Sequence, residues 1–394
     1  MSDGMTIALV GIGGYGNTYV NTLLDAPNQA DFRLAGVVDP SPHLCRRLAE
    51  LEARRVPVYP SMEKLYAEQR PELVIISTPL QLHAPHTSHA LSRGSHVLCE
   101  KPLCVTPDQA DQMKHARDAA GKLVSIGYQW SFSQAIGDLK ADILAGRFGR
   151  PKRLRALVLW PRDEVYYGRN RWAGAKTDSA GNLVLDSPVN NACAHYLHNL
   201  LYLTGKQVDR SAQPATLTAE LYRAHPIQNY DTAALRGTTA DGMEVIFIVS
   251  HATPVRRGPV FSCEFERGVV EFTDAGQTVT ATFADGTRRN YGSPNDNRDR
   301  KIWLTMQAIR ERTPTPCGIE AAEPHTRCTW AAQQSCPEIT TFDDALICIE
   351  GPAGARKTWV EGLGEALERC YDEGKLPSEL GVPWARSARN VTVA

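Results

Sequence analysis

Residues 185–205, LDSPVNNACAHYLHNLLYLTG, combine one acid with three asparagines and two histidines. A histidine oriented by a carboxylate can accept a proton near neutral pH, because the imidazole pKa lies in that range. Asp186 and His195 are therefore candidates for proton transfer. His195 and His198 stand three residues apart, and no acid at helical spacing completes a ligand set. We therefore expect no metal site here.

The same segment predicts how these groups are positioned. Ser187 and Pro188 fit the N-cap and first position of a helix. On a helical wheel at about 100° per residue, Asn190 falls within an apolar arc, so its buried amide needs a hydrogen-bond partner. A separate polar stripe is predicted on the same helix. It comprises Asn191, His195, His198 and Tyr202.

A second candidate site is the glycine-rich stretch LVGIGGYGN, residues 9–17. Gly11, Gly13 and Gly16 have G-x-G-x-x-G spacing, with Gly14 between them, after a strand-like run and before a helical one. Such glycines let backbone N–H groups approach a pyrophosphate at a helix N-terminus. Asp39 ends the next predicted strand, where a carboxylate binds ribose hydroxyls and repels a 2′-phosphate. This favours NAD over NADP; the alternative for Asp39 is a helix N-cap.

The composition bounds the class of protein. The 394 residues suffice for two domains, and 43 Lys and Arg nearly cancel 44 Asp and Glu, so no global charge favours nucleic acid or anionic membranes. The ten cysteines form no C-x-x-C pair, and we expect reduced thiols. We see no signal peptide and no apolar run long enough to span a bilayer, so a cytoplasmic protein is expected.

The elements change character along the chain. Residues 1–127 alternate strand-like and helical segments, including a helix over 41–54, which favours a doubly wound parallel α/β sheet. Residues 128–394 contain strand candidates joined by ADG, ERG and ADG turns. These predict an α+β domain with a large, mainly antiparallel sheet and helices on one side. Residues 161–184 are expected to be a polar loop. The last 90 residues are expected to be helical and to pack back, in part, on the first domain.

Two further motifs make the sequence resemble a known family. The run T-P-x-x-x-H-x-x-H at 78–86 is followed by HVLCEKPL at 96–103. Together with the glycine-rich turn, these motifs resemble the Gfo/Idh/MocA oxidoreductases, which act on sugars and polyols. The resemblance implies a dinucleotide-binding domain followed by a mixed domain. The open face of that domain's sheet commonly mediates oligomerisation, so a homodimer or homotetramer is expected.

The resemblance also implies roles for individual residues. Lys101 is expected at the junction of nicotinamide and substrate, where an ammonium stabilises alkoxide character as hydride leaves. Asp186 matches the acid of the family's D-x-x-x-H motif, but Asn190 stands where the histidine belongs and cannot act as a base. The remaining expected contacts fall into two sets. Those for the cofactor are Thr78, Pro79, His83, Glu100, Lys101, Gln129 and Trp172; those for the substrate are Lys101, Arg171, Asn191 and His195.

The missing histidine leaves three interpretations open. His195 accepts the proton, Lys101 or a relay through substrate hydroxyls accepts it, or the polar stripe is structural. His225, Asp231 and His251 either line a substrate pocket or simply sit on the sheet. The leading hypothesis is an NAD-dependent oxidoreductase that moves a hydride between nicotinamide and a sugar, glycoside or cyclic polyol. The alternatives are a glycosidase-like enzyme that uses tightly bound NAD for transient oxidation, and a non-catalytic dinucleotide sensor.

Overall fold

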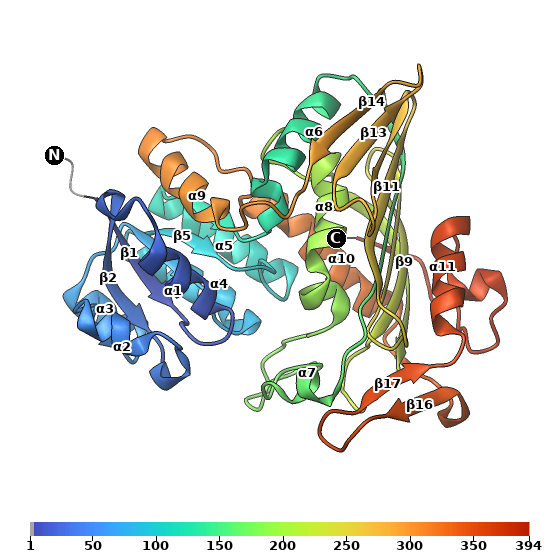
Figure 1. Ribbon diagram of the computed structural model, residues 1–394, viewed down its shortest axis with the longest axis horizontal. Coiled ribbons are helices and arrows are strands. Elements are labelled where there is room, and N and C mark those ends of the chain that lie inside the picture. Colours follow the sequence, from blue (N-terminus) through green and yellow to red (C-terminus); the bar gives the residue numbers. More distant parts are fainter. Residues whose placement is uncertain (1–3, 394) are drawn as a thin grey trace. The chain divides into compact units, whose positions relative to one another are not determined.

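The computed structural model describes residues 4–393, which form two compact units (Figure 1). The first unit contains the chain up to Gln129 together with residues 297–322. The second unit contains residues 130–296 and 323 onward. No helix among residues 4–393 is long and apolar enough to cross a membrane.

The first unit is built on a six-stranded parallel sheet with the strand order β3-β2-β1-β4-β5-β6. Its strands are β1 (Met5–Val10), β2 (Phe32–Val38), β3 (Val58–Tyr59), β4 (Leu73–Ile76), β5 (His96–Cys99) and β6 (Val124–Ile126). Its helices are α1 (Gly16–Asp25), α2 (Leu48–Ala53), α3 (Met62–Glu68), α4 (His83–Ser92), α5 (Pro107–Ala120) and α9 (Arg300–Glu311). The predicted doubly wound α/β sheet is confirmed.

The apolar strands of this sheet explain its burial. Ile7 and Leu9 of β1 are buried in one cluster with Val20 of α1, and Ile302 and Met306 of α9 join the same cluster. Residues 297–322 therefore complete the first unit's core although they follow most of the second unit in sequence. The helix predicted over 41–54 is wrong in extent. Only Leu48–Ala53 is α-helical, after a 3-10 turn at Pro42–Leu44, because the backbone is extended at Cys45 between the two.

The second unit is built on a ten-stranded sheet with the path β14-β13-β12-β11-β7-β10-β9-β8-β15, and β18 pairs with β8. Its strands are β7 (Pro151–Leu159), β8 (Pro214–Arg223), β9 (Thr232–Thr239), β10 (Glu244–Ser250), β11 (Arg257–Phe265), β12 (Gly268–Phe272), β13 (Val279–Phe283), β14 (Arg288–Gly292), β15 (Thr340–Thr341) and β18 (Val391–Thr392). The ADG, ERG and ADG turns join antiparallel pairs as predicted. Strands β7 and β10 are parallel, so the sheet is mainly rather than wholly antiparallel.

Helices cover both faces of this sheet, and the prediction of helices on one side is wrong. The other elements are α6 (Gln134–Leu144), α7 (Glu164–Gly168), α8 (Ala194–Leu203), α10 (Ile319–Ser335), α11 (Leu363–Glu373) and the hairpin β16 (Ile347–Glu350) and β17 (Lys357–Val360). Helix α8 packs on β7 and β11, whereas α11 lies on the opposite face (Figure 1). Leu363 and Leu367 of α11 are buried against Leu157 and Ile248 of the sheet. The end of the chain is therefore only partly helical, and it covers apolar strand residues.

Candidate functional site

The glycine-rich turn between β1 and α1 has the geometry of a phosphate-binding loop. Gly11 has φ +84°, and a Cβ there would lie 2.5 Å from the Ser77 carbonyl oxygen. A Cβ on Gly16 would lie 2.1 Å from the Gly11 oxygen. Both positions therefore require glycine. A Cβ on Gly14 would meet nothing within 4 Å, so the loop's outer side has room for a pyrophosphate at the start of α1.

Asp39 lies directly beside this loop, at the end of β2. Its Oδ2 accepts hydrogen bonds from the backbone N–H groups of Ile12 (2.9 Å) and Gly13 (3.2 Å). Its Oδ1 accepts from the N–H of Ser41 (2.8 Å). A carboxylate has about four acceptor positions, so three are used to tie the loop to the strand. The half-buried carboxylate keeps capacity for one further donor such as a ribose hydroxyl.

Thr78 and His83 follow the end of β4, next to the glycine-rich turn. The Thr78 methyl lies 3.1 Å from the position of a Cβ on Gly11. His83 is buried, with Nδ1 2.7 Å from the Pro102 carbonyl oxygen and Nε2 3.1 Å from that of Thr78. Burial lowers the pKa of His83, and both ring nitrogens face carbonyl oxygens. His83 therefore joins the TP turn to the EKP turn and does not face solvent. Pro79, half-buried, precedes the 3-10 turn at Leu80–Leu82.

Glu100 is held by a buried network within the first unit. It pairs with the buried ammonium of Lys301, and it accepts a hydrogen bond from the Tyr19 hydroxyl at 2.6 Å. Glu100 is almost fully buried, and burial by itself raises its pKa; Lys301 outweighs this and holds the pKa of Glu100 below its usual value. Its other oxygen accepts from the backbone N–H of Lys101 (3.1 Å). Glu100 thus fixes the backbone at the half-buried Lys101.

In the second unit, Asp186 is a buried carboxylate that accepts hydrogen bonds from two neutral donors and lies near one guanidinium. Its Oδ2 accepts from the Gly174 N–H (2.7 Å), and its Oδ1 accepts from the Asn191 side-chain amide (2.8 Å). The Arg169 guanidinium lies 3.8 Å from Oδ2. Asp186 and Asn191, which the sequence analysis predicted separately as site residues, are therefore in contact. The arginine beside them is Arg169; Arg171 is exposed.

The helix after Asp186 begins with a π-turn, which the helical wheel did not predict. Residues Pro188–Ala192 are π-helical, and the Cys193 N–H donates to the Pro188 carbonyl. Ser187 is the N-cap as predicted, since its hydroxyl accepts from the Asn190 N–H (3.1 Å). A π-turn adds one residue to a helical turn and recurs at functional sites. It changes the angular position of every later residue relative to Asn190.

The polar stripe predicted on α8 is therefore wrong in its second half. His198 and Tyr202 are buried, their rings stack at 5.6 Å, and His198 Nε2 lies 2.9 Å from the Ser131 hydroxyl. Burial holds the pKa of His198 well below its usual value. His195 remains half-buried beside the ring of Tyr196. Of the two histidines, only His195 keeps access to solvent.

Asn190 is buried, as the wheel predicted, but only half of its amide is satisfied. Its Nδ2 donates to the Leu185 carbonyl at 3.2 Å. Its Oδ1 has no hydrogen-bond partner among residues 4–393. Leu185 itself has φ +51°, a strained value for a leucine. A buried amide oxygen without a partner, next to a strained residue, is typical of a binding site in which a ligand supplies the hydrogen-bond donor.

Trp172 and Gln129 are the remaining predicted cofactor contacts. Trp172 is half-buried, and the Arg169 guanidinium lies 5.5 Å from its ring. Gln129 begins the 3-10 turn Gln129–Phe132 and is half-buried. Neither position shows a feature that assigns it to a cofactor.

Sequence reasoning missed an aromatic and basic cluster around α7. The segment 161–184 was expected to be a loop, yet Tyr166 and Tyr167 lie on its helix and face His251 and His225. His225 Nδ1 lies 2.8 Å from the buried Asp231 carboxylate. The sequence offered one signal for this helix, namely two adjacent tyrosines that follow a possible aspartate N-cap. A helix of five residues is too short for its hydrophobic periodicity to be recognised.

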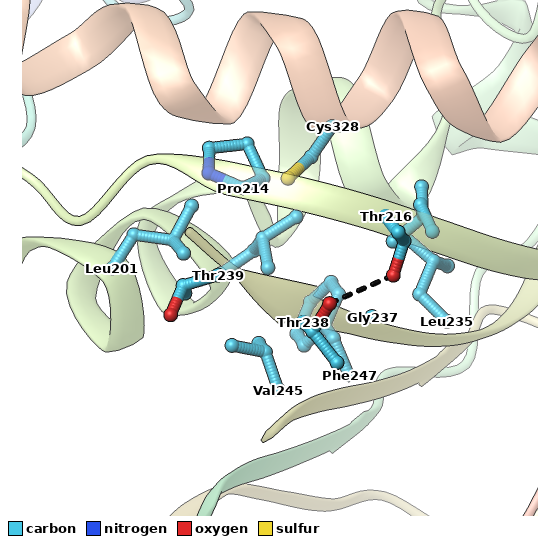
Figure 2. Close-up of a pocket in the computed structure, with 12 residues that line it drawn as sticks. Leu201, Pro214, Thr216, Leu235, Gly237, Thr238, Thr239, Val245, Phe247 and Cys328 are labelled. Atoms are coloured by element: carbon cyan, nitrogen blue, oxygen red, sulfur yellow. Dashed lines mark hydrogen bonds between the residues drawn. The ribbon is translucent and has the colours of Figure 1, made fainter. Parts of the chain in front are cut away.

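A separate apolar pocket lies between helices α8 and α10 and strands β8 to β10 (Figure 2). Its polar groups include Thr216 and Thr238, whose hydroxyls hydrogen-bond to each other at 2.8 Å. Its twelve lining residues are Leu197, Leu201, Pro214, Thr216, Leu217, Leu235, Gly237, Thr238, Thr239, Val245, Phe247 and Cys328. The Thr216 and Thr238 hydroxyls are hydrogen-bonded to each other, and none of the lining residues is charged. The pocket therefore offers packing space and no charged group for chemistry.

Comparisons with known proteins agree with the first unit's geometry. Residues 5–128 match the family model described as "Oxidoreductase family, NAD-binding Rossmann fold". A 1-carboxy-3-chloro-3,4-dihydroxycyclohexa-1,5-diene dehydrogenase from Comamonas testosteroni is 29% identical over 204 residues, 52% of this chain and 49% of that protein. An inositol 2-dehydrogenase from Renibacterium salmoninarum is 28% identical over 207 residues, 52% of this chain and 56% of that protein. The chain spans about half the length of the curated relatives it matches.

Solved structures share the fold over most of the chain. The WlbA dehydrogenase from Bordetella pertussis, in complex with NADH and UDP-GlcNAcA, superposes with a TM-score of 0.70 at 20% identity. The match covers 85% of this chain and 97% of that one. At this identity the likeness establishes the fold of both units. Residues 5–128 of the first unit are similar to the Gfo/Idh/MocA oxidoreductases, whose family model describes an NAD-binding Rossmann fold.

Proposed function

We propose that this chain is an NAD-dependent oxidoreductase that transfers a hydride between nicotinamide and a carbinol carbon of a sugar, glycoside or cyclic polyol. The glycine-rich turn carries the proposal, because Gly11 and Gly16 leave no room for side chains while Gly14 opens to free space. The match of residues 5–128 to an NAD-binding oxidoreductase family supports it. Two similar proteins, which are dehydrogenases of inositol and of a dihydroxylated ring, also support the proposal.

The proposal specifies NAD rather than NADP because of Asp39. The carboxylate lies at the tip of β2 and contacts the turn through Ile12 and Gly13. Its negative charge would repel a 2′-phosphate and accept a ribose hydroxyl. The nearby Arg47 is engaged in ion pairs with Asp25 and Glu50, at 2.7 and 2.5 Å, so it does not offset that repulsion.

Within the proposal, three residues handle the substrate oxygen and its proton. Lys101 holds the hydroxyl and stabilises the developing alkoxide. His195 accepts the proton, since it is the half-buried histidine of α8 and Asn190 has no basic nitrogen. Asp186 accepts a hydrogen bond from the Asn191 side chain and thereby orients that amide at the start of the helix. Bound NAD supplies the hydride acceptor.

The proposal also includes a homo-oligomer and a cytoplasmic location. A homo-oligomer that uses the second unit's sheet on the side of α11 would also contact that helix. Next to α11 this side carries the ion pairs Arg153–Glu244 and Arg155–Glu264, at 2.7 and 2.8 Å, and Arg155 also donates to the Asp372 carbonyl of α11. Such a surface fits a polar rather than an apolar interface. All ten cysteines are free thiols, which favours a cytoplasmic enzyme.

The test incubates the purified chain with NAD⁺ or NADP⁺ and a panel of sugars, glycosides and cyclic polyols. NADH formation, followed by its absorbance, is expected with NAD⁺ and at least one class of substrate. His195→Gln is expected to lower turnover by about 10²-fold or more without changing NAD affinity. Product release without net NADH contradicts simple oxidation and favours transient oxidation. Cofactor binding without reaction of any panel member favours the sensor.

A further inference from the structure

The ring of Tyr166 in the second unit is surrounded by basic side chains. The Arg162 guanidinium lies 4.5 Å from the ring centroid, and that of Arg169 lies 3.7 Å from it. The His251 ring packs edge-on at 5.4 Å. These three groups come from the end of β7, the end of α7 and the end of β10. One aromatic ring therefore collects three nitrogen-rich side chains at one end of the sheet.

His251 presents a buried nitrogen that lacks a partner. The residue is 1% exposed, and its Nδ1 lies 3.0 Å from the Tyr167 hydroxyl. Burial holds the pKa of His251 well below, and that of Tyr167 well above, their usual values. Both groups are therefore neutral, Tyr167 donates its O–H to Nδ1, and Nε2 carries the ring's N–H. Nε2 has no hydrogen-bond partner within residues 4–393.

Arg162 supplies a second buried donor and an uncompensated charge. Its Nε is inaccessible to solvent and has no partner in the described part of the chain. No carboxylate within residues 4–393 lies close enough to form an ion pair with Arg162; the nearby Asp163 caps α7 and accepts from the Tyr166 N–H. The Arg162 backbone N–H donates to the His251 carbonyl at 3.0 Å, which holds the two residues together. Buried donors left without acceptors are costly and rare in folded proteins.

The acids around the cluster are occupied elsewhere. Asp186 accepts from Gly174 and Asn191. Asp231 accepts from the backbone N–H and the ring Nδ1 of His225, at 2.7 and 2.8 Å. The His225 ring in turn packs at 4.7 Å against Tyr167, which orients His251. The network therefore fixes the histidine rigidly and leaves the charge of Arg162 for a ligand.

We infer that Arg162 and His251, packed on Tyr166, form a subsite for the carboxylate group of an acidic sugar. Two N–H donors, one of them cationic, match the acceptor oxygens of a carboxylate, and arginine is suited to this planar anion. This inference rests on the proposed function in taking the ligand to be a sugar or polyol. It narrows the substrate class to molecules that carry a carboxylate, such as uronic acids.

The experiment measures binding by calorimetry to the chain saturated with NADH, which prevents oxidation during the titration. The probes are D-glucuronate and D-galacturonate, the matched neutral D-glucose and D-galactose, and D-glucose 6-phosphate. We expect at least one uronate to bind about tenfold or more tightly than its neutral counterpart. Arg162→Gln is expected to remove that preference and leave the affinity for the neutral sugar unchanged.

The matched control is Arg256→Gln. Arg256 is exposed and stacks on Trp160 at 4.8 Å, the ring that Arg162 also approaches at 5.6 Å. The control removes the same charge from the same region and is expected to keep the preference for uronate. Tyr167→Phe removes the hydroxyl that orients His251 and is expected to weaken uronate binding by a few fold, with no effect on NADH affinity.

Three results would overturn the inference. These are equal affinity of the wild type for uronates and neutral sugars, tighter binding of the phosphate ester than of either uronate, and equal losses in R162Q and R256Q. Failure of the proposed function gives a different result. In that case, uronate binding depends on Arg162 but no NADH forms when the same uronate is supplied with NAD⁺.

Discussion

Glu100 and Asp186 are both buried carboxylates that sequence motifs single out, but they are neutralised in different ways. Glu100 pairs with the buried ammonium of Lys301 and accepts from Tyr19 inside the first unit. Asp186 accepts from the Gly174 backbone N–H and the Asn191 amide, and the Arg169 guanidinium lies 3.8 Å away with 29% of its side chain exposed.

The difference separates a structural acid from one suited to chemistry. A buried carboxylate with a full counter-charge is locked in place, because breaking the pair leaves an unpaired buried charge. A carboxylate held by neutral dipoles keeps most of its own charge and acts on groups that approach it. The predicted cofactor contact of Glu100 is still a prediction, but its contacts within the unit make it first a support for the backbone at Lys101.

The largest effect expected from this comparison is on stability. Lys301→Met leaves the charge of Glu100 buried without its partner, which should lower the free energy of unfolding by about 3–5 kcal/mol. Urea unfolding followed by circular dichroism measures the change. A loss below about 1 kcal/mol would show that Glu100 is not held as the structure indicates.

The control for this variant is the double substitution Glu100→Gln with Lys301→Met. It removes both charges and should recover most of the lost stability. The pH dependence gives a second check. Lys301 holds the pKa of Glu100 below its usual value, so its stabilisation is present above the unfolded pKa of about 4.3 and is lost as pH falls through the folded pKa. The wild type should therefore lose stability in acid more steeply than the double variant.

The second prediction concerns activity and applies to the other carboxylate. Asp186→Asn keeps the shape and removes the charge, so turnover should fall by about 10²- to 10³-fold while NAD affinity stays unchanged. Its cost in stability should be about 1 kcal/mol, because one oxygen remains for the Gly174 N–H. Steady-state kinetics, cofactor titration and urea unfolding measure the three quantities.

A matched acid elsewhere in the second unit serves as the control. Asp241 is exposed and pairs with Lys206 at 2.8 Å, so Asp241→Asn should leave turnover and stability near wild type. If Asp186→Asn loses stability as strongly as Lys301→Met while keeping its turnover, the assignment of structural and chemical roles to the two acids is reversed.

The first unit could be predicted from the sequence because its signals are local. The glycine turn, the strand-ending Asp39 and the EKP motif each lie within one strand-turn-helix, and parallel strands bring such turns to one edge. Lys301 could not be predicted as the partner of Glu100, since 201 residues separate them. Nothing in the sequence around Lys301 marks it as buried, and a lysine is rarely buried unless it is paired.

The second unit was predictable in architecture but not at its site. The three hairpin turns gave the antiparallel strands, whereas the wheel drawn from Asn190 assumed a regular α-helix. The π-turn at Pro188–Ala192 broke that assumption and placed His198 in the core. A π-turn depends on the packing of neighbouring segments, as where the Asn229 side chain binds the Asp186 carbonyl, and leaves little signal in its own residues. Helix α11 was unexpected on its face of the sheet for the same reason: its amphipathic pattern predicts a helix but not the surface it covers.

The smallest expected effect tests which arginine acts on Asp186. Arg169→Gln should change the free energy of unfolding by about 1 kcal/mol or less, because the guanidinium is partly exposed, at 3.8 Å from the carboxylate, and stacks on Tyr166 at 3.7 Å. Removing the Arg169 charge should raise KM and lower kcat by a few fold. The sequence alone favoured Arg171, an exposed residue of the same loop, and Arg171→Gln is the paired variant. Kinetics of the two variants distinguish them: an effect of Arg171→Gln alone would mean that the arginine beside Asp186 is not the one that the reaction uses.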